Sequence, residues 1–157
     1  MSAIRFVSLP GEQAAAYWSG APDANGQAPE VHVSDGDGVP CRHCQQDVAA
    51  GERYLILAHR PFPAAQPYAE VGPIFLHAEP CPRYPETGRI PPMFLARASY
   101  LLKGYSAADR IVYGTGQIVP SPEIAAAAAR ILARDDVAYV HVRSATNNCF
   151  SCRVERG

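Results

Sequence analysis

The sequence predicts an α+β protein in which a mainly antiparallel β-sheet is packed against one or two helices. Segments with the composition of strands far outnumber those with helical periodicity, and most neighbouring strands are joined by short loops. The chain has 157 residues, 48% of them hydrophobic, which is enough for one core. We therefore expect a single α+β domain over residues 1–157 with no internal repeat.

The first part of the chain is expected to be mostly extended. Residues 4–9 read as a short strand, and residues 10–18 as a helix that Pro10 opens near its first turn. Residues 19–30 are rich in Gly, Pro, Asn and Asp and predict a loop. The stretch 61–92 is rich in proline. Apart from the strand that it contains, it is expected to be an ordered loop rather than a helix. The strands expected in this part cover residues 31–33, 52–59 and 72–77.

The next segments predict a hairpin followed by the clearest helix. Residues 97–105 and 110–119 read as its two strands. Ser121 is expected at the N-cap of the helix, Pro122 at its first position and Glu123 in its first turn, facing the helix dipole. The helix should end near residue 134. Its apolar face is expected to contain Ile124, Ala128, Ile131 and Leu132.

Composition excludes some partners and sets the expected state of the thiols. The formal net charge is −1 with no basic stripe, so we expect no nucleic-acid partner. No window approaches the ~20 apolar residues of a membrane-spanning helix, so we expect no membrane partner. The N-terminal residues do not resemble a signal peptide, which predicts a cytoplasmic protein. The five cysteines should then be reduced, as thiols or metal ligands.

Two pairs of residues predict a zinc site. Cys41 and Cys44 have the spacing of a zinc knuckle, whose tight turn brings both thiolates to one ion. His77 and Cys81 follow at the end of a predicted strand. If strands 52–59 and 72–77 pair antiparallel, the start of the first lies beside the end of the second, and the two pairs meet. Three thiolates, a neutral imidazole and Zn²⁺ leave one net negative charge, which the neighbouring arginine of the knuckle could offset. The alternative is that Cys41 and Cys44 are small buried side chains and His77 a hydrogen-bonded histidine at a strand end.

The C-terminal hairpin offers a second candidate site. Strands are expected at residues 137–143 and 149–155, around a turn at 146–148. Alternation places His141 and Arg143 on one face. A turn centred on residues 146 and 147 sets His141 opposite Cys152, and a turn one residue later sets Arg143 opposite Cys152. A basic neighbour would lower the pKa of Cys152 and make it a nucleophile, but we expect a buried thiol.

Several motifs are spread over the chain from Pro40 onward. They are Pro40-Cys41-Arg42, Gly51-Glu52, Pro67-Tyr68, Gly72-Pro73-Ile74-Phe75, Tyr139-Val140-His141-Val142 and the segment from Cys149 to Arg153-Val154. Together they resemble a bacterial family catalogued as domain of unknown function 1203. The resemblance implies a bacterial protein with a single-domain fold and no particular activity.

These observations lead to two functional hypotheses. The first is a small binding or structural domain with a structural zinc ion held by Cys41, Cys44, His77 and Cys81. The second is an enzyme that uses Cys152, near His141 and Arg143, for thiol chemistry.

Overall fold

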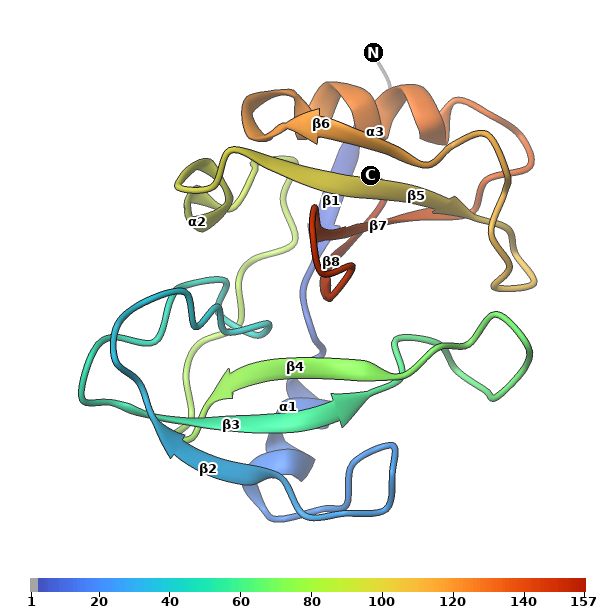
Figure 1. Ribbon diagram of the computed structural model, residues 1–157. Helices are drawn as coiled ribbons and strands as arrows, with labels where there is room; N and C mark the ends of the chain where they lie inside the picture. Colours follow the sequence, from blue (N-terminus) through green and yellow to red (C-terminus); the bar gives the residue numbers. More distant parts are fainter. Residues whose placement is uncertain (1–2) are drawn as a thin grey trace.

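The computed structural model describes residues 3–157, and within them the strands form two antiparallel sheets rather than one (Figure 1). The larger sheet has the strand order β1-β8-β7-β5-β6 and the smaller one the order β2-β3-β4. The α+β class is confirmed, with a low helix content. The elements are β1 (Ile4–Val7), α1 (Gly11–Trp18), β2 (Glu30–Val33), β3 (Arg53–His59), β4 (Gly72–His77), α2 (Pro92–Leu95), β5 (Ser99–Tyr105), β6 (Gln117–Pro120), α3 (Ile124–Leu132), β7 (Tyr139–Ser144) and β8 (Phe150–Arg156).

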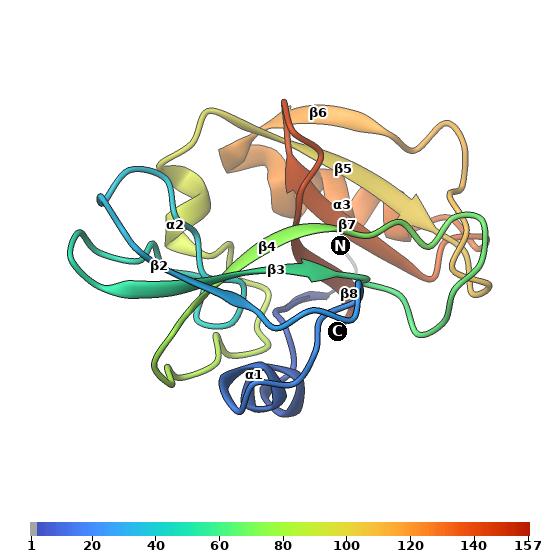
Figure 2. The same cartoon turned by 60° about the horizontal axis from the view of Figure 1, so that its bottom comes forward.

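Helix α3 packs on one face of the larger sheet. The four residues predicted for its apolar face are all buried, and they pack against Val140, Val142, Cys152 and Val154 of the sheet. Helix α1 belongs to the other side of the molecule, where its Ala14 packs with the smaller sheet (Figure 2). Each sheet therefore has an apolar cluster of its own, instead of the single core that composition alone suggested.

The start of α3 differs from the prediction. Ser121–Glu123 form one 3-10 turn before the α-helix begins at Ile124, and Ser121 does not cap it. The Ser121 hydroxyl instead donates a hydrogen bond of 2.5 Å to the carbonyl oxygen of Arg97. The side chain is buried against the preceding chain, so a tertiary contact replaces the local capping bond.

The predicted hairpin over residues 97–119 is confirmed as a pair of antiparallel strands, but its second strand is short. Only Gln117–Pro120 forms β6, paired with the first part of β5. The residues before it form turns, joined to β5 by one bridge between Tyr105 and Ile111. The short helix α2, which ends the proline-rich stretch, was not predicted.

In the smaller sheet, β3 lies between β2 and β4. Strands β3 and β4 pair antiparallel as predicted, with Tyr54 opposite His77 and His59 opposite Gly72. The β2 strand at the edge is exposed along its whole length. The end of β4 therefore lies beside the start of β3 and close to the segment that precedes β3. In the described residues, no helix is long and apolar enough to cross a membrane.

The β7–β8 pair contains a bulge that changes the expected register. Beside the turn, Ser144 N donates to Cys149 O, and Arg143 lies opposite Phe150, as a turn centred on residues 146 and 147 requires. The register then shifts by one residue at Ser151, so that Cys152 lies opposite Val142 rather than His141 or Arg143. Both predicted partners of Cys152 are therefore wrong.

Candidate metal centre

The knuckle is a tight turn held by backbone hydrogen bonds. Gln45 N donates to Cys41 O at 3.0 Å, and Gln45 adopts a left-handed conformation with φ of 58°. Arg42 N donates to Phe75 O at 3.0 Å, which fixes the turn beside β4. The knuckle thus stands next to the strand that carries the second pair of candidate ligands.

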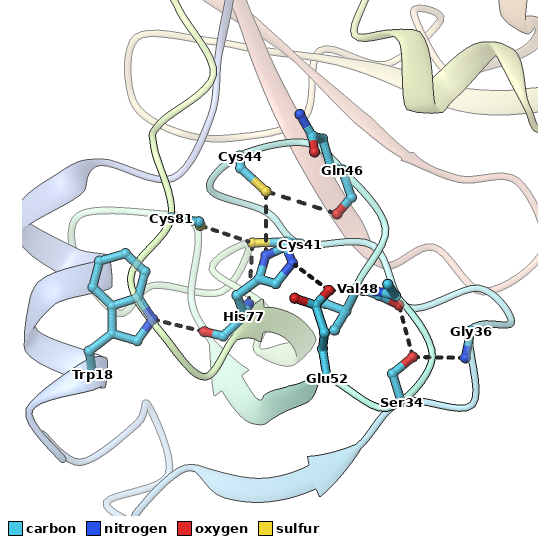
Figure 3. A network of polar contacts seen from close by, with 11 residues as sticks. Trp18, Ser34, Gly36, Cys41, Cys44, Gln46, Val48, Glu52, His77 and Cys81 are labelled. Carbon is cyan, nitrogen blue, oxygen red and sulfur yellow. Dashed lines mark hydrogen bonds and ion pairs between the residues drawn. The ribbon is translucent and has the colours of Figure 1, made fainter.

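The structure brings the two predicted pairs together (Figure 3). His77 is the last residue of β4, and Cys81 lies in the turn that follows. The possible ligand atoms of Cys41, Cys44, His77 and Cys81 all lie within 4.8 Å of one another. Cys41 and Cys44 are buried, and the other two residues are partly buried. The predicted meeting of the two pairs is confirmed.

Two separations within the cluster match those of a tetrahedral metal site. The Cys41 and Cys81 sulfurs are 3.8 Å apart, and Cys44 Sγ lies 3.4 Å from His77 Nδ1. With Zn–S bonds of about 2.3 Å and Zn–N bonds of about 2.0–2.1 Å, tetrahedral angles give about 3.8 Å between sulfurs and about 3.5 Å between sulfur and nitrogen. Three sulfurs and one imidazole nitrogen at these separations suit Zn²⁺ better than hard cations, which prefer oxygen ligands.

Two neighbouring side chains, Glu52 and Trp18, lie against His77. Its Nδ1 faces the thiols, while its Nε2 lies 3.9 Å from Oε1 of Glu52. Trp18 Nε1 donates to the His77 carbonyl oxygen at 2.8 Å, which fixes the end of β4. A carboxylate on the far nitrogen of a ligating histidine is a common outer-shell arrangement in zinc sites.

The three thiols are electrostatically coupled. Contacts with the Cys44 and Cys81 thiols lower the pKa of Cys41. The same contacts with Cys41 raise the pKa of Cys44 to about 11 and also raise the pKa of Cys81. One thiolate therefore forms readily and suppresses the other two, because three negative charges this close repel one another. All three ionise together only with a cation among them.

His43, which lies inside the knuckle, is a further neighbour of the cluster. Its Nδ1 lies 3.4 Å from Cys81 Sγ, and its ring meets Trp18 edge-on with ring centroids 5.3 Å apart. It lies outside the group of four mutually close ligand residues. Its position between Cys41 and Cys44 in the sequence was the signal that could have suggested this contact with Cys81.

Two side chains of the knuckle tie it to the larger sheet. Arg42 Nε donates to Phe150 O at 2.8 Å, and Gln45 Nε2 donates to Ser151 O at 3.1 Å. Both acceptors lie at the β8 bulge, where the ladder of the sheet is interrupted. The Arg42 guanidinium also lies over the Phe75 ring, 5.5 Å from its centroid. Arg42 thus lies in the contact between the sheets, and burial there lowers its pKa to about 10.

The structure separates the residues of the hairpin candidate. His141 and Arg143 lie on one face of the larger sheet, with Arg143 Nη2 2.9 Å from His141 Nδ1. Cys152 is fully buried on the opposite face, in the cluster beneath α3, and burial raises its pKa to about 12. The thiol that shares a surface depression with Arg143 is Cys149. The expected buried state of Cys152 is confirmed, and this arrangement gives a Cys152 nucleophile no support.

The fold and the cluster define a two-sheet α+β protein with a candidate Cys₃His metal centre. The model of the family described as protein of unknown function (DUF1203) matches residues 38–156, so the chain belongs to that family. The matched segment contains all four cluster residues and both strands of the C-terminal hairpin. No curated protein and no solved structure matches the chain.

Proposed function

We propose that this protein is a small binding domain of the bacterial cytoplasm whose fold is stabilised by a structural Zn²⁺ ion. Cys41, Cys44, His77 and Cys81 would be its ligands. The observation that carries the proposal is the mutual approach of their four ligand atoms to within 4.8 Å. A net charge of −1 and five free cysteines fit a protein of a reducing compartment without a nucleic-acid or membrane partner.

The arrangement favours a structural ion over a catalytic one. Four protein ligands complete a tetrahedral zinc sphere, whereas catalytic zinc keeps one position for water or substrate. The knuckle also donates hydrogen bonds from Arg42 and Gln45 to β8 of the other sheet. A metal at this position would therefore fix the turn through which the two sheets are joined.

Metal analysis of untagged protein, purified without added metal, tests the proposal. We expect about one equivalent of zinc per chain, with X-ray absorption showing three sulfurs at about 2.3 Å and one nitrogen at about 2.0–2.1 Å. Cys44→Ser should lose the metal, whereas Cys149→Ser, which removes a thiol outside the cluster, should retain it. Metal below about a tenth of an equivalent, together with free titration of all the cluster thiols, would contradict the proposal.

A further inference from the structure

A cavity of about 390 Å³ lies away from the metal cluster, where the end of β3 meets the larger sheet. His59 and the loop that follows it form one wall, and the segment joining β1 to α1 forms another. The floor is the face of the larger sheet opposite α3, represented by His141 of β7 and by Phe150 and Arg153 of β8. Its size is within the range of small-molecule sites, roughly 300–1,000 Å³.

Unpartnered polar atoms are concentrated in this cavity. Nine buried side-chain nitrogen or oxygen atoms in residues 3–157 have no hydrogen-bond partner. One of them, Arg153 Nε, is ion-paired with Glu155 Oε2, and four of the others belong to residues that line the cavity. Native proteins leave few buried polar groups unpaired, so such a concentration indicates a place where another molecule supplies the partners. The four atoms are Ser8 Oγ, His59 Nδ1, Arg60 Nε and His141 Nε2.

His141 presents a hydrogen-bond donor there. Its Nδ1 lies 2.9 Å from Arg143 Nη2, and because a guanidinium only donates, Nδ1 is the acceptor. Burial and the charges of Arg143 and Arg153 lower the pKa of His141 well below its usual value, so the ring is neutral. The single ring proton is therefore on Nε2, which is fully buried and has no partner. Such a donor matches an oxygen acceptor on a ligand.

The charged lining residues match a ligand with one negative charge. Arg60 has no ion-pair partner in the described part of the chain, and Arg153 pairs with Glu155 at 2.5 Å. His59 is neutral at pH 7, since burial lowers its pKa to about 4. Two guanidinium groups and one carboxylate leave a single net positive charge.

The rest of the lining is apolar and aromatic. Phe150 stands between the two histidines, with ring centroids 5.8 Å from His59 and 4.8 Å from His141, and Phe62 lies 5.2 Å from His141. We propose that this cavity binds a small organic monocarboxylate, with the carboxylate accepting from Arg60 and His141 and the apolar part against Phe62 and Phe150. Inorganic phosphate is largely a dianion at pH 7.5 and fits the single net charge less well.

The inference names a ligand class for the proposed binding domain and rests on it in that respect, but it does not require zinc. The metal cluster and the cavity share no residue. Metal content and ligand binding are therefore measured on the same preparation, and either can fail while the other stands.

Calorimetric titration with acetate, benzoate and inorganic phosphate at pH 7.5 and low salt tests the inference on the full chain. Benzoate should bind saturably and more tightly than acetate, because its ring adds apolar contact, and phosphate should bind more weakly than benzoate. Arg60→Gln should weaken benzoate binding by about tenfold or more, since it removes a charge-assisted hydrogen bond.

Arg130→Gln is the matched control, because it removes one positive charge on α3, beyond the other face of the larger sheet. It should leave affinity for benzoate unchanged. Absence of saturable binding of every probe up to about 10 mM would overturn the inference. So would phosphate binding more tightly than benzoate, or equal affinity in wild-type protein and Arg60→Gln. In a folded Arg60→Gln variant, nuclear magnetic resonance shifts caused by benzoate at Phe150 and His141 should also be lost.

Discussion

The two sheets are stabilised in different ways. Among the described residues, the apolar cluster of the larger sheet contains 16 buried side chains, several of them from α3, and burial of this apolar surface stabilises the sheet. The cluster of the smaller sheet has 10 residues, and two of them are the candidate ligands Cys41 and Cys44. Its edge strand β2 is exposed throughout. A sheet of three strands with so small a core needs a further source of stability.

This difference indicates that a metal ion would stabilise the smaller sheet more than the larger one. The proposed ion would cross-link the segment before β3 to the turn after β4, and both lack regular secondary structure of their own. The site does not exist in the unfolded chain, so the free energy of metal binding becomes free energy of folding. The larger sheet contributes no ligand to the cluster, so we expect no such dependence there.

Metal removal is expected to have the largest effect. With a strong chelator, the free energy of unfolding of the smaller sheet should fall by more than about 5 kcal/mol, because structural zinc contributes on that scale. Hydrogen exchange should then show faster exchange in β3 and β4 before β5 and β7. If chelation accelerated hydrogen exchange equally in both sheets, or in neither, the proposed difference in stability between the sheets would be wrong.

A core truncation should affect the other region by a smaller amount. Ile124 is fully buried beneath the larger sheet, and Ile124→Ala should destabilise the protein by about 2–5 kcal/mol through lost burial and a cavity. Denaturant unfolding measures this, and zinc content should remain at the wild-type level.

Ile118→Ala is the control, since Ile118 is 62% exposed and its truncation should change stability by less than about 0.5 kcal/mol. Loss of metal from Ile124→Ala would mean that the two regions are not independent.

The two regions also differ in how well the sequence predicted them. The strand pair β3–β4 and the four-residue cluster were predictable, because a short non-helical connection requires antiparallel pairing and pairing fixes which ends meet. The buried face of α3 was predictable from its periodicity. The first inference depends on a short connection between two strands, and the second on the spacing of apolar residues along one helix.

What could not be predicted depends on tertiary contacts. The bulge at Ser151 follows no local sequence rule, yet it moves Cys152 from the expected partners to Val142 and turns Phe150 toward His141. Its freed carbonyl groups accept from Arg42 and Gln45, more than 100 residues earlier in the chain. The division into two sheets and the cavity between them depend on the same contacts, so neither was predicted.

Acid should weaken the junction between the two regions through His59. Burial lowers the pKa of His59 from 6.5 to about 4 in the folded protein. The unfolded state therefore binds a proton first, so this stability is complete above pH 6.5 and is lost as pH falls from about 6.5 to about 4. The loss should be roughly 3 kcal/mol.

Acid also competes with metal for the cluster thiolates, so the His59 contribution is taken as the difference between wild type and His59→Gln. Unfolding free energies at several pH values should fall less steeply in the variant. His32→Gln, at the exposed edge strand, should follow the wild type. Parallel pH curves for wild type and His59→Gln would rule out this role.

The smallest expected effect concerns an ion pair between the regions. Asp47 follows the knuckle, and its two carboxylate oxygens accept from Arg97 at 2.7 and 3.1 Å, near the start of β5. Both side chains are partly exposed, so the pair should contribute only about 0.2–1 kcal/mol and less in high salt. Because Arg97 also donates to Met93 O, its truncation alone would overstate the interaction, and a double-mutant cycle of Asp47→Asn with Arg97→Gln isolates it. A coupling above about 2 kcal/mol would contradict the view that the knuckle and its proposed metal, rather than surface charges, join the sheets. The same cycle for Arg134 and Asp136, an ion pair within the larger region, supplies the reference value.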